Sequence, residues 1–251
     1  MAETPPAAVP LPPWPAIDFA QFGPIETRPL PRNQALTAAF LARNWSMIPH
    51  VTHHDEVDIG DFEVRRKAWN NAPDATRITP LVPLMKAVAA ALHEYPMFNT
   101  SLDIAGKSLT WKKYVHLGIV TETPAGLLVP VIRDVDKIGF VELAQDLAAK
   151  LERARTKGLP MADMSGGCFS ISSLGNVGGM AFTPIINAPE VAVLGVLPMA
   201  QRAVPDENGV AWRQVLPLSL SYDHRVINGA DAARFVAFVG ARLRDPALFD
   251  G

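Results

Sequence analysis

SLSYDHRVINGADAARF, residues 219–235, is the stretch on which both the fold and the chemistry of this chain depend. It runs from a predicted strand into a predicted helix through a polar turn that holds Asp223, His224, Arg225 and Asn228. A histidine at such a junction is either a structural residue or a base held at a strand end. Polar groups packed between an apolar strand and an apolar helix cost free energy unless they are paired or functional. The crowding of this turn therefore favours a catalytic His224.

Hydrophobic periodicity outward from this stretch predicts a mixture of helices and strands. Capping signals such as Asn33 and Thr79-Pro80 mark where helices begin. The predicted helices are residues 33–47, 62–70, 81–95, 140–158 and 230–243. The predicted strands are residues 50–59, 167–174, 190–197 and 212–222, with a hairpin at 101–111 and two strands within 115–132. These elements follow no strict βαβ rhythm, so we expect an α+β fold with a mixed sheet.

The N-terminus is rich in proline: the chain has 23 in 251 residues, and many lie within the first 31. This texture predicts an extended Pro/Ala-rich linker and arm over residues 1–32, followed by one folded domain over residues 33–251. The arm also carries large apolar side chains, so we expect it to lie on the body of the protein or on a neighbour. These side chains are Trp14, Ile17, Phe19 and Phe22. A linker with nothing before it implies an upstream module that was removed, or a partner supplied separately.

Composition excludes several classes of protein. The 23 Lys and Arg residues against 25 Asp and Glu give a formal net charge of -2, which argues against a nucleic-acid binder or a polybasic membrane surface. The sequence has no apolar run of the roughly 20 residues that a membrane span needs, and no secretory signal pattern. A single cysteine fits a reducing compartment. We therefore expect a cytoplasmic protein.

A second polar cluster lies in GGCFSISSLGNVGGMAFTP, residues 166–184, where a serine-bearing strand runs into a glycine-rich loop. The segment matches neither a dinucleotide fingerprint, nor a P-loop, nor the nucleophile elbow of a serine hydrolase. It is either a strand edge with a flexible hairpin or a serine hydroxyl held at a strand end. In the second interpretation the glycines let a ligand approach the backbone.

A metal site is not expected from the histidines of the predicted strand at residues 50–59. His50 and His54 would share one face of that strand and His53 the other, so the three do not converge as zinc ligands. Cys168 lies within an apolar strand and is expected to be a small core residue rather than a nucleophile.

Four long segments, in this order, resemble the catalytic domain of the 2-oxo acid dehydrogenase acyltransferases, and within that family its acetyl-transferring members. They are residues 14–26, 43–59, 166–196 and 216–235. The family signature Asp-His-Arg-x-x-Asp-Gly stands here as DHRVING, with Asn228 in place of the second aspartate. The resemblance implies a chloramphenicol-acetyltransferase-like mixed sheet flanked by helices, and trimers with active sites between subunits.

The resemblance also implies a function for each polar cluster. The chain would transfer an acetyl group between a dihydrolipoyl thiol and coenzyme A, without a metal. His224 would be the general base, and Ser172 would donate a hydrogen bond to the oxyanion. Asn228 would orient the turn through its amide. Arg43 and Phe182 would contact coenzyme A, although Arg43 also fits a solvated helix face. The lipoyl group would be carried on another domain or chain.

The implied partners are other copies of the chain and the components of a 2-oxo acid dehydrogenase complex, most simply that of pyruvate. These components are the dehydrogenase, dihydrolipoamide dehydrogenase and a lipoyl domain, which in this family lies upstream or is supplied in trans. Leu248 and Phe249 are candidates to anchor homotrimers into a larger core. Two alternatives stay open: an acetyltransferase that acts on a small alcohol, and a non-catalytic core or scaffold subunit.

Overall fold

The computed structural model describes residues 13–124, 126–207 and 209–249. Its helices are α1 (Arg32–Met47), α2 (Gly60–Asn71), α3 (Leu81–Glu94), α4 (Phe140–Thr156) and α5 (Gly229–Arg244), with 3-10 turns η1 (Phe19–Gln21), η2 (Pro96–Asn99), η3 (Met161–Asp163) and η4 (Pro246–Phe249). Its strands are β1 (His50–Asp58), β2 (Thr100–Leu102), β3 (Leu109–Trp111), β4 (Leu117–Thr123), β5 (Gly126–Leu128), β6 (Val131–Ile132), β7 (Phe169–Ser173), β8 (Ala192–Val196), β9 (Ala200–Asp206) and β10 (Gly209–Asp223). No helix in these ranges is long and apolar enough to cross a membrane.

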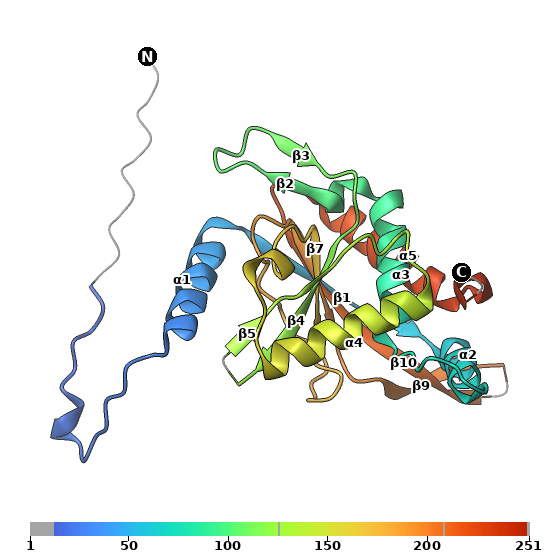
Figure 1. Ribbon diagram of the computed structural model, residues 1–251, viewed down its shortest axis with the longest axis horizontal. Coiled ribbons are helices and arrows are strands. Elements are labelled where there is room, and N and C mark those ends of the chain that lie inside the picture. Colours follow the sequence, from blue (N-terminus) through green and yellow to red (C-terminus); the bar gives the residue numbers. More distant parts are fainter. Residues whose placement is uncertain (1–12, 125, 208, 250–251) are drawn as a thin grey trace.

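A mixed sheet forms the centre of the molecule (Figure 1). Its strand order is β1-β10-β8-β7-β4-β5, with β6 paired to β4 and β9 paired to the first half of β10. β4, β7 and β8 run parallel, whereas β10 is antiparallel to β1, β8 and β9. The α+β fold class expected from the sequence is confirmed.

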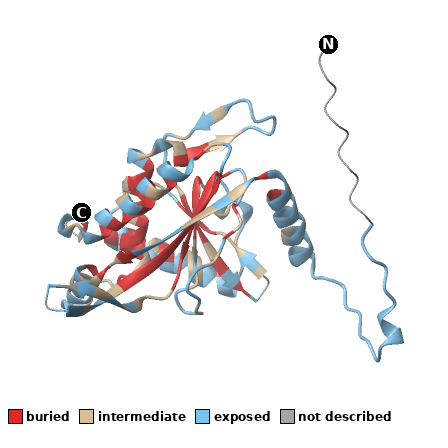
Figure 2. Ribbon diagram, turned by 180° about the vertical axis from the view of Figure 1, so that it is seen from behind, coloured by how far each residue is buried: buried red, intermediate tan, exposed pale blue. Residues whose placement is uncertain are grey.

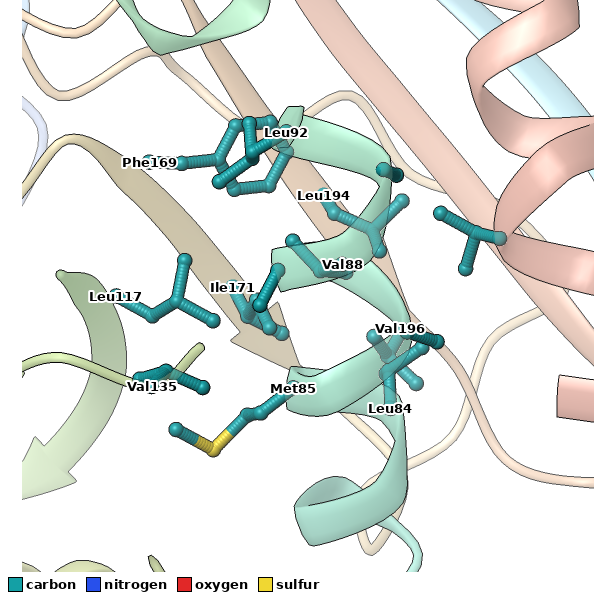
Figure 3. Packing of buried hydrophobic residues seen from close by; sticks show 14 of the residues in the cluster. Leu84, Met85, Val88, Leu92, Leu117, Val135, Phe169, Ile171, Leu194 and Val196 are labelled. Atoms are coloured by element: carbon teal, nitrogen blue, oxygen red, sulfur yellow. The ribbon is translucent and has the colours of Figure 1, made fainter. Parts of the chain in front are cut away.

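One face of the sheet is covered by α3, α4 and α5 and carries the core. Alternate strand residues, such as Ile171 and Leu194, point toward Leu84, Val88 and other side chains of α3 (Figure 3). Each fully buried aliphatic side chain of this kind contributes about 1.5–3 kcal/mol. Figure 2 shows the buried residues gathered in the central strands and in the helices that pack on them.

The opposite face of the sheet carries serines, a threonine and glycine beside a few apolar residues such as Val193. Ser170 and Ser172 lie on β7, and Ser219 and Ser221 lie on β10. The side chains of Thr52 and Ser221 are hydrogen-bonded at 2.8 Å across the β1–β10 pair. β7 and β10 therefore both direct serine side chains to this face of the sheet.

The N-terminal arm stands away from the body of its own chain (Figure 1). Residues 13–31 are exposed throughout, with Trp14 at 93% and Phe22 at 80%. α1 buries only Asn44, and it begins at Arg32 after Pro31 rather than at an Asn33 cap. Of the two expectations for the arm, contact with its own body is wrong, and contact with a neighbour remains. The rest of the linker lies outside the described residues.

The C-terminal turn η4 packs Leu248 into the core of its own chain, where it is 6% exposed. Leu248 is therefore not available on the surface as the anchor expected from the sequence. The side chain of Phe249, the other expected anchor, lies outside the described part of the chain.

Candidate active site

The His224 turn is fixed by its backbone and leaves the imidazole accessible. The N–H of His224 donates to the carbonyl of Pro49 at 3.1 Å, and the N–H of Asp223 donates to Val191 O at 2.8 Å. Asp223 is 2% exposed, and its carboxylate accepts hydrogen bonds from Arg225 Nε at 2.9 Å and Nη2 at 2.6 Å. That ion pair raises the pKa of Arg225. Asp223 is therefore the buried polar residue of the turn, whereas His224 is exposed.

Asn228 is the N-cap of α5 and uses both ends of its amide. Its Oδ1 accepts the backbone N–H of Asp231 at 2.9 Å, and its Nδ2 donates to Asp231 Oδ2 at 2.6 Å. A capping side chain of this kind typically stabilises by about 1 kcal/mol. The asparagine thus holds the start of the helix that follows the His224 turn, and its role here requires a donor as well as an acceptor.

Ser172 lies near the end of β7 on the polar face of the sheet. Its register partners are Val120 on β4 and Gly195 on β8. Phe182 covers Gly195 so closely that a Cβ there would lie 2.5 Å from the phenylalanine ring. The loop that leads from the end of β7 to Phe182 contains Gly178 and Gly179 at φ values of 136° and 103°, which other residues rarely adopt. Phe182 is thereby placed beside the strand residue next to Ser172.

Ser172 and His224 do not meet within one chain. Ser172 is level with Gly195, which pairs with Ser219 of β10, and His224 follows Ser219 by five residues. At about 3.3 Å per residue, the two levels are separated by roughly 16 Å along the strands. A reaction that uses both side chains therefore requires a second copy of the chain.

Arg43 lies on the same side of the molecule as the His224 turn, and Phe182 lies on the side of Ser172. Arg43 borders a pocket of about 320 Å³ that is also lined by Asp223 and Arg225. Its guanidinium donates to Asn44 Oδ1 at 2.9 Å and lies over the ring of Phe40. The two residues expected to contact coenzyme A are therefore not brought together in one chain.

His50 has a structural role that sequence reasoning missed. Its Nδ1 donates to Ile48 O at 2.8 Å, and its Nε2 accepts the N–H of Ile186 at 2.9 Å. His54 is bonded to Ser219 Oγ at 2.8 Å. Within the described ranges no three His, Cys, Asp or Glu side chains are grouped as metal ligands. Cys168 is fully buried, and burial raises the pKa of its thiol to about 11, as suits a core residue.

Comparison with known proteins places this geometry in a family. The model of the catalytic domain of the 2-oxoacid dehydrogenases acyltransferase family matches residues 23–249. The chain belongs to this family. A curated acyltransferase relative, the dihydrolipoyllysine-residue acetyltransferase component of the pyruvate dehydrogenase complex of Cupriavidus necator, is 50% identical over 235 residues. These residues are 93% of this chain but 42% of the relative, so the chain spans less than half of that protein's length.

Solved structures of the acyltransferase family share the whole fold. Two of them match with a TM-score of 0.91 and 47% identity, covering 96% of this chain and 100% of theirs. One is the dihydrolipoamide acetyltransferase of Azotobacter vinelandii, studied for the roles of a serine, a histidine and an asparagine in catalysis. The other is the cubic core of a pyruvate dehydrogenase multienzyme complex. A chloramphenicol acetyltransferase, 17% identical with a TM-score of 0.55 over 81% of this chain and 94% of its own, shares the fold alone, as expected from the sequence.

Proposed function

We propose that this chain transfers an acetyl group between a dihydrolipoyl thiol and coenzyme A, as the core acyltransferase of a 2-oxo acid dehydrogenase complex, that of pyruvate. The observation that carries the proposal is the polar set of Ser172, His224 and Asn228. These residues follow one another at the same intervals as the serine, histidine and asparagine studied in the Azotobacter vinelandii enzyme. The partners on this proposal are the dehydrogenase, dihydrolipoamide dehydrogenase and a lipoyl domain, and the location is cytoplasmic.

The assembly that this function requires is a homotrimer in which His224 of one subunit faces Ser172 of the next. Two observations support it: the two side chains lie at different levels of the sheet in one chain, and residues 13–31 of the arm are exposed throughout. A trimer is the smallest ring in which every subunit gives His224 to one neighbour and Ser172 to the other. Native mass measurement distinguishes a trimer from a larger core such as the cubic one.

In this arrangement His224 acts as general base. Its neutral imidazole accepts the proton of the coenzyme A thiol, and the thiolate attacks the thioester carbonyl of the acetylated dihydrolipoyl group. Ser172 donates a hydrogen bond to the tetrahedral oxyanion, a contact typically worth about 3 kcal/mol. Collapse of the intermediate expels the dihydrolipoyl thiolate, which takes the proton back from His224. Holding the two long thiols end to end supplies much of the rate by proximity.

The coenzyme would approach from the side of the His224 turn. Arg43 and Arg225 on the pocket beside that turn offer positive charge to its phosphates. Phe182 of the subunit that contributes Ser172 would then contact the pantetheine near its reactive end. Arg225 is already paired with Asp223, so Arg43 is the more available cation of the two.

Substrate choice tests the proposed function. Purified protein supplied with acetyl-coenzyme A is expected to acetylate free dihydrolipoamide and to leave a panel of small alcohols unreacted, because a thiol gives up its proton to an imidazole far more readily than an alcohol does. Faster turnover of an alcohol would support the alternative acetyltransferase. Absence of turnover with every acceptor, in a protein of confirmed fold and oligomeric state, would support the scaffold alternative.

Replacing Asn228 by aspartate is expected to lower the stability of the fold rather than to change the pH dependence of turnover. The new carboxylate would face Asp231 across the 2.6 Å contact that the amide now makes, and two carboxylates at that distance repel. Because aspartate can still cap the helix, only the repulsion counts, and we expect a loss of about 0.2–0.5 kcal/mol in unfolding free energy, measured by denaturant titration. The matched control is the exchanged pair Asn228→Asp with Asp231→Asn, which restores one donor and one carboxylate.

The same variant tests how position 228 contributes to activity. A carboxylate aimed at His224 would favour its protonated form and move the rising limb of turnover to higher pH. Because the Asn228 amide is directed at Asp231, we expect the pH profile to move little. A shift of about one pH unit or more would show that the position acts on the base by charge.

A further inference from the structure

A buried carboxyl lies beneath the segment that leads into β8. Glu190 is 4% exposed, and its Oε1 accepts a long hydrogen bond from Asn187 at 3.4 Å. Among the described residues its Oε2 has no hydrogen-bond partner, and neither has Oγ of Ser170, the fully buried hydroxyl that faces it. A buried polar group without a partner is costly. The structure shows no hydrogen bond between these two atoms, and a proton on the carboxyl would let a small approach of the two groups satisfy both.

The surroundings of this pair are closely packed. A Cβ on Gly118 would lie 2.8 Å from Ser170 Oγ, and a Cβ on Gly167 would lie 3.1 Å from Glu190 Oε1. Both positions are glycine, so the neighbouring backbone approaches the hydroxyl and the carboxyl directly. The neighbouring backbone therefore leaves no room for a larger side chain beside either group.

The pair connects the two halves of the proposed active site. Ser170 lies two residues before Ser172 on the same face of β7. Glu190 precedes Val191, whose carbonyl accepts the N–H of Asp223 and so anchors the His224 turn. Pro189, Glu190 and Val191 also border the pocket beside that turn.

We propose that Glu190 is a positioning residue for the acyl transfer: its buried carboxyl donates a hydrogen bond to Ser170 and holds the Ser172 strand and the anchor of the His224 turn in register. The inference rests on the proposed function. Each subunit contributes His224 to one site and Ser172 to another. One Glu190 would therefore affect the geometry of two sites of the trimer.

The charged and titratable groups that face Glu190 in the described part of the chain are consistent with a neutral carboxyl. Burial raises the pKa of Glu190 to about 7, against the opposing effects of Ser170, Lys112 and Asn187. The Nζ of Lys112 donates a hydrogen bond to Thr100 O at 2.8 Å, and burial lowers the pKa of this lysine. The thiol of Cys168 stays neutral, since burial raises its pKa to about 11. The carboxyl is therefore predominantly protonated below about pH 7.

Two variants and a matched control test the role. Glu190→Ala is expected to lower kcat about 10–10²-fold with KM within about two-fold, because misalignment acts on the chemical step. Glu190→Gln keeps a neutral donor and is expected to retain at least about a third of wild-type kcat at pH 6. Glu63→Ala removes another buried carboxylate, paired with Arg66 at 2.7 Å in α2, and is expected to leave kcat per folded subunit within about two-fold.

The pH dependence separates positioning from general destabilisation. The ratio of kcat for Glu190→Gln to that for wild type cancels every titration the two proteins share. We expect this ratio to rise several-fold between pH 6 and 8, as the wild-type carboxyl ionises and loses its donor. A flat ratio, a change confined to KM, or an equal loss in Glu63→Ala would overturn the proposal.

Melting temperature tests the carboxyl without any assay of activity. The folded-state pKa lies above the ordinary 4.5, so the stability from protonated Glu190 is complete below pH 4.5 and is lost as pH rises through about 7. Relative to wild type, Glu190→Gln should therefore gain melting temperature over this interval. If wild type proves inactive toward dihydrolipoamide, the proposed function fails, and so does the positioning role. If the enzyme is active but Glu190→Gln shows no such gain in melting temperature, the proposed hydrogen bond from the protonated Glu190 carboxyl to Ser170 is wrong.

Discussion

Turnover with acetyl-coenzyme A and dihydrolipoamide is expected to fall roughly 10²–10⁴-fold when His224 is replaced by alanine. The imidazole is the exposed group of a turn whose backbone is already held by Pro49 and Val191. Removing it therefore takes away the proton acceptor and leaves the hydrogen bonds of the turn in place. Folding and oligomeric state, followed by melting temperature and native mass, should match those of the wild-type protein.

The control for His224 is a histidine that shares its exposure but not its position. His93 lies on α3, where it is paired with Asp136 at 3.1 Å. His93→Ala should retain turnover within a few-fold, so that a general effect of losing an exposed histidine is excluded. Turnover of His224→Ala within a few-fold of wild type would remove His224 from the mechanism.

The elements around the active site could be predicted because their patterns are local. β7 and β8 fall within the predicted strands, because an apolar run that is short and bounded by glycine or proline favours a buried strand over a helix. β9 was missed because it is an edge strand: it contains Arg202 and Pro205 and offers no apolar stripe. The start of α1 was misplaced by one residue because Pro31 precedes it without a side-chain cap.

The site required information that no local pattern carries. The sequence identifies the turn of His224 and the strand of Ser172, but their separation depends on how β10 pairs with β8. Glu190 was overlooked because an acidic residue at the start of an apolar strand usually lies in solvent. The available signal was its context, a glutamate between Pro189 and an unbroken apolar run that predicts a buried strand.

Replacing Ser172 by alanine is expected to lower turnover by about 10²-fold or more, with little change in the Michaelis constants. The hydroxyl stabilises charge that exists only in the transition state, so its loss acts on kcat. Ser173 is the matched control, because alternation along β7 turns it toward the opposite face of the sheet, where it borders a separate cavity. Ser173→Ala should stay within a few-fold of wild type. A Ser172 variant that only weakens coenzyme A binding would give this hydroxyl a ground-state role.

Mixing the two inactive variants tests where the active site lies. In a homotrimer whose sites are shared, every mixed trimer has three sites: one keeps both His224 and Ser172, one lacks both, and one lacks a single group. Exchange of His224→Ala with Ser172→Ala subunits, followed by mass spectrometry of differently tagged chains, should therefore restore a substantial fraction of wild-type turnover. The roughly 16 Å separation of the two levels within one chain gives the physical reason. Proven exchange without any recovery would place the whole reaction within a single subunit, and the register of β10 against β8 would then have to differ in the active enzyme.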